Sequence, residues 1–214
     1  MNSNQWQSHY AKEKSELSYP DENLVRLLSS YMKNRPSSVS TAAVDLGCGS
    51  GRHLKLLKDF NVDEIIGVDS SMNALSIAKK NKCGRLILCG NSALALKSES
   101  ADIAIAWGSL HYSHKRELPV MINEIIRILK TGGRLFATLR SSRDSMLRTG
   151  VHLGDDVWKT SLADIAGATV SFFPEDEIKM YFAPFKKTEY GLIERTIIGD
   201  MKSRVSHWVI HAVK

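Results

Sequence analysis

The sequence contains no apolar run that approaches the ~20 consecutive residues of a membrane-spanning helix. Its first residues, Met1 to Trp6, lack the apolar core of a secretory signal peptide. These two absences predict a cytoplasmic protein with no membrane partner.

Cysteine is also scarce. Cys48, Cys83 and Cys89 form no CxxC pair and leave an odd thiol, which fits a reducing cytoplasm. The histidines show no metal-ligand spacing with acids or cysteines, so no metal site is predicted.

The charge balance is basic but diffuse. The chain has 29 Lys and Arg residues against 23 Asp and Glu residues, a net charge of +6. This balance permits an acidic partner such as RNA, but the basic residues are scattered rather than grouped in one block. A solvated basic surface is therefore favoured over an RNA site.

The 214 residues fit one α/β domain, which would bury roughly 70% of the surface of the unfolded chain. Apolar stretches alternate with segments of helical periodicity through the first two thirds of the sequence. The apolar stretches are continuous rather than alternating, which is typical of a parallel sheet covered on both faces. The expected strands are 42–46, 64–69, 85–90, 101–108 and 134–139, and the expected helices are 24–32, 52–60, 70–78 and 117–130.

The alternation of predicted strands and helices ends after Arg140. Residues 141–172 read as irregular and polar, and residues 174–182 predict a short helix. Residues 187–198 and 205–213 predict two long strands, and their short connection makes them antiparallel neighbours. The predicted fold class is α/β, with a seven-stranded, mostly parallel sheet, helices on both faces and a C-terminal antiparallel strand pair.

Three glycines follow the first strand. Gly47, Gly49 and Gly51 alternate with other residues between a buried strand and an amphipathic helix. In such a turn the backbone can approach a nucleotide-like ligand closely, and a Cβ would obstruct both the dihedral angles and the ligand. Taken alone, this turn leaves a nicotinamide-dependent oxidoreductase open.

Two acidic residues narrow the choice of ligand. Asp45 stands just before the glycines, where a pyrophosphate would gain little from a negative charge but a cationic group would be favoured. Asp69 ends the second strand, 22 residues after Gly47, where a carboxylate can accept hydrogen bonds from both ribose hydroxyls. A ligand with a ribose, no phosphates and a cationic end points to S-adenosylmethionine.

At four places the sequence resembles the class I S-adenosylmethionine-dependent methyltransferases, and most closely their small-molecule group, methyltransferase type 11. Val44 to Gly51 resembles the first motif of that family, and Gly67 to Ser71 resembles the second. Ala101 to Ala104 resembles the fourth-strand motif, and Leu129 to Leu135 resembles the motif after the next helix. The resemblance covers about residues 40–140 and implies a Rossmann-like fold.

The resemblance also implies an organisation for the single domain, residues 1–214. Residues 1–40 would form an N-terminal lid or helix segment, and residues 41–140 the cofactor-binding core. Residues 141–214 would form an acceptor-side segment and the C-terminal strand pair. The acceptor pocket would come from residues 1–20, 109–116 and 141–175, which match no specific pattern.

Family behaviour implies roles at the matching positions. The glycines would admit the methionine portion of the cofactor, Asp45 would orient its amino end and Asp69 would hold its ribose. Residues after the second and third strands would enclose the adenine, and residues after the fourth would border the methyl-transfer site. Asn91 stands where many relatives have Asp, and its amide oxygen can still accept a bond from the adenine amine. The implied cofactor-binding set is Asp45, Gly47, Cys48, Gly49, Gly51, Asp69, Ser70, Met72, Gly90, Asn91, Ser92, Trp107 and Gly108.

Three roles stay open at this point. His111, near the expected methyl-transfer site, is either a general base or a residue that only shapes the pocket. Asp45 either orients the cofactor or hydrogen-bonds the backbone amides of the glycine turn. Trp6, Tyr10 and Tyr19 form either a lid or ordinary packing anchors.

The leading hypothesis is a methyltransferase that transfers a methyl group from S-adenosylmethionine to oxygen or nitrogen of a small molecule, leaving S-adenosylhomocysteine. No Asn/Asp-Pro-Pro-aromatic segment follows the fourth strand and no Pro-Cys pair occurs, which argues against methylation of adenine amines and of cytosine C5. The alternatives are a tRNA or rRNA methyltransferase, a nicotinamide-dependent oxidoreductase and a non-catalytic cofactor-binding protein. The acceptor and the oligomeric state stay open.

Overall fold

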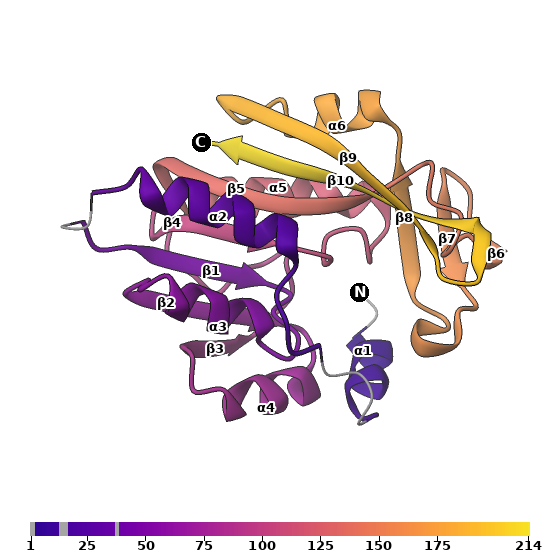
Figure 1. The fold of residues 1–214 in the computed structure, drawn as a ribbon, viewed down its shortest axis with the longest axis horizontal. Coiled ribbons are helices and arrows are strands. Elements are labelled where there is room, and N and C mark those ends of the chain that lie inside the picture. The colour runs from indigo at the N-terminus through magenta and orange to yellow at the C-terminus, as the bar shows by residue number, and fades with distance from the viewer. Residues whose placement is uncertain (1–2, 13–16, 37–38) are drawn as a thin grey trace.

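The computed structural model describes residues 3–12, 17–36 and 39–214. Five parallel strands form the centre of its sheet in the order β3-β2-β1-β4-β5 (Figure 1). All five overlap segments that were predicted as strands, although β5 begins at Leu129, five residues before the predicted start and within the predicted helix 117–130. The middle strands are buried over nearly their whole length, as their apolar composition requires. Their bounds are β1 Ala42–Leu46, β2 Glu64–Asp69, β3 Arg85–Leu88, β4 Ala101–Ala106 and β5 Leu129–Ser141.

Helices cover both faces of this sheet. Alternate strand residues point to opposite faces, so that Ala43 and Ile105 join one buried cluster while Val44 and Ala104 join the other. The first cluster includes α2 (Glu22–Lys33), α3 (Arg52–Asp59) and α4 (Met72–Lys80), and the second includes α5 (Leu118–Ile128) and α6 (Glu175–Phe182). Among the described residues, no helix has the length and apolarity to cross a membrane.

The C-terminal strands pair as predicted. β10 (Asp200–Val213) runs antiparallel between β5 and β9 (Lys187–Ile197). The seven strands therefore lie in the order β3-β2-β1-β4-β5-β10-β9, which confirms the Rossmann-like sheet with a reversed strand pair.

Residues 141–172 are more regular than predicted. They contain β6 (Gly150–His152), β7 (Val157–Thr160) and most of β8 (Thr169–Phe173), which extend the sheet to ten strands. β8 runs parallel to the last two residues of β5, and β7 and β6 continue from it in antiparallel pairs. These strands have only three to five residues, so their local pattern is weak, and pairing with the end of β5 determines their conformation.

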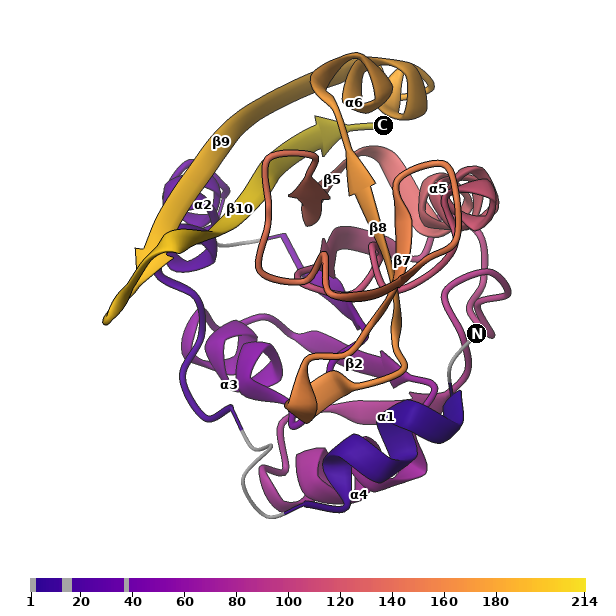
Figure 2. The ribbon, with the colours of Figure 1, turned by 90° about the vertical axis from the view of Figure 1, so that its right-hand side faces the viewer.

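The N-terminal helix α1 (Ser3–Tyr10) bridges the two sides of the molecule (Figure 2). On one side Gln7 holds the start of α4, because its side-chain oxygen accepts a bond of 3.0 Å from the Asn73 backbone N–H. On the other side His9 Nδ1 lies 2.9 Å from the Asp164 carbonyl oxygen, and Gln5 bonds the Gly167 carbonyl. Helix α1 is thus fixed between α4 and the segment that leads into β8.

Candidate cofactor and acceptor site

The glycine turn at the end of β1 adopts a conformation that favours glycine. Gly47, Gly49 and Gly51 have φ angles of +76°, +54° and +85°. A Cβ on Gly47 would lie 2.5 Å from Ser109 Cβ, and a Cβ on Gly49 would overlap the Tyr10 hydroxyl. At these two positions the turn leaves no room for a side chain.

Asp69 ties this turn to the next helix. Its Oδ2 accepts a bond of 2.9 Å from the Gly49 backbone N–H, and its Oδ1 accepts one of 2.8 Å from the Ser71 N–H. Burial raises the pKa of the Asp69 carboxyl above its ordinary value, while the hydrogen bonds from Ser71 and Gly49 act in the opposite direction. The carboxylate therefore holds two elements in place and still faces a cavity.

Two adjoining cavities lie at the carboxyl ends of the strands. The smaller has a volume of about 80 Å³ and the larger about 600 Å³. Both are lined by Trp6, Tyr10, Gly47, Gly108 and Tyr112, so they open onto a common region beneath α1.

Most of the predicted cofactor residues meet at these cavities. The smaller one is lined by Gly47, Asp69, Ser70, Gly90, Asn91 and Gly108, and the larger one by Gly47, Cys48, Gly49, Trp107, Gly108 and His111. Chain segments separated by about 60 residues thus converge, because the carboxyl ends of parallel strands share one edge of the sheet.

Four predicted residues lie outside the lining of both cavities. Gly51 begins α3, and a Cβ there would lie 3.1 Å from Ala78 Cβ, so this glycine allows two helices to pack closely. Met72 is half exposed in the first turn of α4, and Ser92 lies beyond the part of its loop that faces the smaller cavity. Asp45 is buried in β1 behind the turn.

Asp45 faces a histidine that the sequence patterns did not single out. His53 Nδ1 lies 3.6 Å from Asp45 Oδ2, and His53 lines the larger cavity. Neither carboxylate oxygen of Asp45 has a hydrogen-bond partner among the described residues. The amides of the turn bond elsewhere, with Gly47 and Cys48 donating to the Val68 carbonyl and Gly49 to Asp69. Asp45 thus does not cap these amides.

The environment of His111 favours the neutral ring. The side chain is 1% exposed, and its Nδ1 has no hydrogen-bond partner within the described ranges. Burial lowers the pKa of His111 well below its ordinary value, and the nearby Arg140 and His207 lower it further. A proton on this ring would therefore be destabilised.

The aromatic residues of the N-terminal segment divide into two groups. Trp6 and Tyr10 line both cavities, and Trp6 packs edge-on against Tyr112 with ring centroids 4.8 Å apart. Tyr19 is 85% exposed and lines neither. Residues 1, 2 and 13–16 of the predicted lid segment lie outside the described residues, as do residues 37 and 38.

The comparison with known proteins identifies the domain in the core of the chain. Residues 44–137 match a family model described as a methyltransferase domain, of the type 11 group. The structure has the fold of the S-adenosylmethionine-dependent methyltransferases. An uncharacterised protein of Methanocaldococcus jannaschii is 30% identical over 134 residues, 62% of this chain and 55% of that protein. The chain therefore spans about half the length of this relative.

Solved structures share the methyltransferase fold. A methyltransferase from Methanosarcina mazei has a TM-score of 0.66 at 18% identity, over 82% of this chain and 92% of that one. A 1,6-didemethyltoxoflavin-N1-methyltransferase from Burkholderia thailandensis, with 1,6-didemethyltoxoflavin and S-adenosylhomocysteine bound, has a TM-score of 0.66 at 17% identity, over 90% and 77% of the two chains.

The residues of this methyltransferase domain fit S-adenosylmethionine, the cofactor of the family. Gly47 and Gly49 line the larger cavity without a side chain, and the Asp69 carboxylate faces the smaller one. Asp45 lies outside the lining of both cavities and faces His53, so its predicted contact with the amino end of the cofactor stays a prediction. In the described ranges, no group of three or more His, Cys, Asp or Glu side chains is placed to hold a metal ion.

Sequence patterns missed several residues that line the cavities. Met121 belongs to the smaller one, and Thr138, Arg140, Arg195 and His207 belong to the larger. Ser109 and Ser113 of the smaller one lie in the segment 109–116 that was predicted for the acceptor pocket. The position of Arg140 at the carboxyl end of β5 was a usable signal, since ligands bind outside the carboxyl ends of parallel strands. No local signal pointed to Arg195 or His207.

The burial of His207 makes the stability of the protein sensitive to acid. Burial and the nearby Arg140 lower the pKa of His207 from 6.5 to about 4. The unfolded chain takes up this proton first, so the free energy of unfolding falls as the pH drops from 6.5 to 4, by about 3 kcal/mol in total. Urea unfolding at pH 7, 6 and 5 should show a smaller loss in His207→Asn than in the unaltered protein, with exposed His152→Asn as the control. Equal losses in the unaltered protein and in His207→Asn would contradict this assignment.

Proposed function

We propose that this chain transfers a methyl group from S-adenosylmethionine to an oxygen or nitrogen atom of a small molecule. The observation that carries the proposal is the larger cavity of about 600 Å³, which extends from predicted cofactor residues such as Gly47 and Cys48 to residues of β9 and β10. Its volume lies within the roughly 300–1,000 Å³ of small-molecule sites. The Burkholderia neighbour, whose structure holds 1,6-didemethyltoxoflavin and S-adenosylhomocysteine, supports a small acceptor.

When bound, S-adenosylmethionine supplies a methyl group that is already activated by the sulfonium. The protein then contributes mainly by positioning and by exclusion of water. Gly47 and Gly49 would allow close approach of the backbone, Asp69 would accept bonds from the ribose, and Asn91 would border the adenine. Trp6 and Tyr10 would cover the reacting groups from α1.

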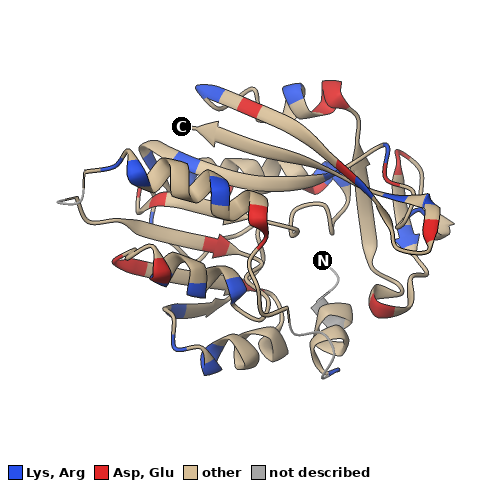
Figure 3. Cartoon of the chain, in the orientation of Figure 1, with Lys and Arg blue, Asp and Glu red and all other residues tan. Residues whose placement is uncertain are grey.

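The distribution of charge supports a small acceptor rather than RNA. Figure 3 shows Lys and Arg spread over helices and strands on several sides of the chain, with acidic residues among them. RNA-binding surfaces instead group exposed basic residues along one face or groove. A small molecule inside the larger cavity fits this distribution better.

We expect His111→Gln to keep most of the activity. A neutral glutamine preserves the uncharged character of the site, so kcat should fall less than about tenfold and the shape of the pH–rate profile should not change. Any loss should appear mainly as a higher KM for the acceptor, because His111 lines the larger cavity. A fall in kcat of about 100-fold or more, with one limb of the pH profile lost, would instead assign His111 as the base.

The test of the proposed function is transfer of a labelled methyl group. Protein is incubated with radiolabelled S-adenosylmethionine and fractionated cell extract, and label is measured in metabolites, RNA and protein. Calorimetry with S-adenosylhomocysteine and with NADH accompanies it. Label in a metabolite supports the proposal, and label in RNA or protein rejects the small acceptor. Binding of S-adenosylhomocysteine without any transfer favours a non-catalytic role, and binding of NADH alone rejects the cofactor assignment.

A further inference from the structure

We infer that the acceptor carries an oxyanion, a carboxylate or phosphate, and that Arg140 and Arg195 bind it in the larger cavity. This inference rests on the proposed function, because it assigns the acceptor to that cavity. It starts from two arginines on different strands that line the same space.

The strand register brings these arginines to one face of the sheet. Arg140 of β5 lies directly opposite His207 of β10, and Val205 of β10 lies directly opposite Arg195 of β9. Residues two apart on a strand share a face, so Arg140, His207, Val205 and Arg195 all line the larger cavity. The pairing of β5, β10 and β9 therefore builds one wall of the site.

Arg140 is held rigidly and keeps a free donor. The residue is 9% exposed. Its Nη1 donates to Asp144 Oδ2, and the same oxygen accepts a bond of 2.9 Å from the Ser206 N–H. Asp144 Oδ1 accepts a further bond of 3.2 Å from the Leu147 N–H. Arg140 Nε, by contrast, has no partner among the described residues. A buried guanidinium N–H without a partner is costly, and an acceptor oxyanion would satisfy it.

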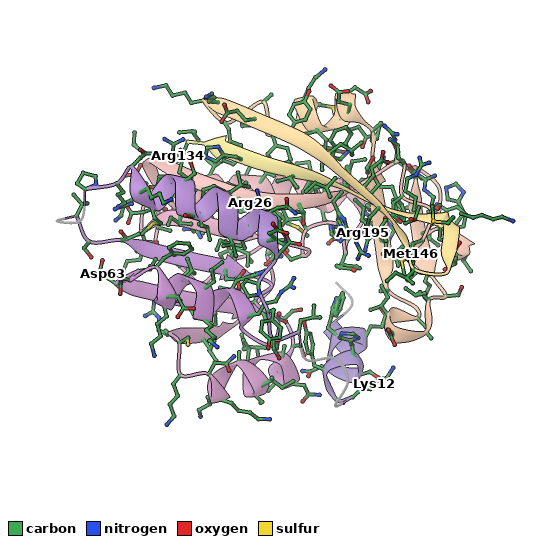
Figure 4. All side chains as sticks on the ribbon, in the orientation of Figure 1. Lys12, Arg26, Asp63, Arg134, Met146 and Arg195 are labelled. Carbon is green, nitrogen blue, oxygen red and sulfur yellow. The ribbon has the colours of Figure 1, made fainter. Side chains whose placement is uncertain are left out.

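Arg195 adds an uncompensated charge. It is exposed on β9, and none of the ion pairs formed by the described residues includes it. Its neighbour Glu194 is already paired with Arg143 at 2.8 Å and with Arg204 at 3.9 Å. Figure 4 marks Arg195 near the region where β9 and β10 cross toward β8.

The balance of charge in the larger cavity is positive. Arg52, Arg140 and Arg195 line it, whereas Asp21 is its only carboxylate within the described ranges. Asp21 Oδ1 accepts a bond of 2.9 Å from the Asn23 N–H at the start of α2. Asp144 compensates the charge of Arg140, whereas the charge of the Arg195 guanidinium has no ion-pair partner among the described residues. Such a lining favours an anion and disfavours a cationic acceptor.

The depth of Arg140 favours a small anion over a polymer. A nucleic-acid backbone is bound by exposed cations that reach its phosphates. Arg140 is nearly buried, and the cavity that it lines lies beneath Trp6 and Tyr10 of α1. A metabolite of limited size can occupy this space.

The test compares matched probes on protein saturated with S-adenosylhomocysteine. Calorimetry measures the binding of benzoate, of neutral benzamide and of inorganic phosphate. We expect benzoate or phosphate to bind at least about tenfold more tightly than benzamide, and Arg195→Gln to weaken the tighter anion by about tenfold. The stronger of the two anions identifies the acceptor group as carboxylate or phosphate. Arg85→Gln is the control, because Arg85 is exposed on β3, pairs with Glu64 at 3.8 Å and lines neither cavity.

Three readouts separate the possible failures. Arg195 is on the surface, so its variant should fold, and binding of S-adenosylhomocysteine by Arg195→Gln verifies this. If the unaltered protein does not bind S-adenosylhomocysteine, the proposed function fails and this inference fails with it. If it binds, but benzamide binds as well as both anions or Arg195→Gln binds them unchanged, this inference alone is overturned. In the labelled extract, the methylated metabolite should come from an anionic precursor, and a neutral or cationic precursor, RNA or protein would overturn it.

Discussion

The Asp69→Asn variant is expected to bind S-adenosylhomocysteine about 100-fold more weakly than the unaltered protein, because the substitution disrupts the turn and the proposed contact with the ribose together. Both carboxylate oxygens of Asp69 accept backbone bonds, one from Gly49 at 2.9 Å and one from Ser71 at 2.8 Å. An asparagine has only one side-chain oxygen, so its NH₂ group must face one of these N–H donors.

Asp102→Asn is the matched control for this prediction. Asp102 stands near the amino end of β4, at the opposite edge of the sheet from Asp69. Its carboxylate bonds Lys130 at 2.8 Å, the Ala42 N–H at 2.9 Å and Arg35 at 3.2 Å. We expect this variant to lose stability in urea unfolding while its affinity for S-adenosylhomocysteine is retained. Similar affinities of the two variants would mean that Asp69 is not a cofactor contact.

The second large effect is expected from Gly47→Ala. An alanine there must adopt a φ of +76°, and its Cβ would lie 2.5 Å from Ser109 Cβ. The positive φ costs about 1–2 kcal/mol, and the overlap must move either the turn or the loop that carries Ser109. Because both segments line the smaller cavity, we expect binding of S-adenosylhomocysteine and methyl transfer to fall by about 100-fold or more.

Gly132→Ala separates the cost of the positive φ angle from the effect of the overlap with Ser109 on cofactor binding. Gly132 has a φ of +77°, almost the same as that of Gly47, and no atom lies within 4 Å of the position of its Cβ. It lies on the strand that follows α5, outside both cavities. This variant should show a similar strain cost in unfolding and unchanged cofactor affinity. If Gly47→Ala matched it in both measurements, Gly47 would be required only for the fold.

The glycine turn and Asp69 were predictable because they depend on short stretches of sequence. The direction of β1, the glycines after it and the helix that follows occupy residues 42–59, and the local periodicity of apolar residues determines each of these elements. The parallel order of the strands then brings Asp69 to the turn. The type of cofactor follows from contacts within two neighbouring strand–helix units.

Where sequence reasoning failed, the missing information was tertiary. The strands β6 to β8 are too short for their local pattern to overcome the polar residues around them, and they form by pairing with the end of β5. Met72, which the family resemblance placed beside the adenine, is half exposed in the first turn of α4, and this role stays a prediction.

The sequence by itself determined the fold class of this protein and the type of its cofactor, because both follow from residues close together in the chain and from strand polarity. Only the tertiary structure decided which side chains line the larger cavity, the proposed site of the acceptor. Arg140, His207 and Arg195 are far from the glycine turn in sequence and meet through the register of three paired strands. A shift of one residue in that register would turn these side chains to the opposite face of the sheet, and no local pattern in the sequence specifies it.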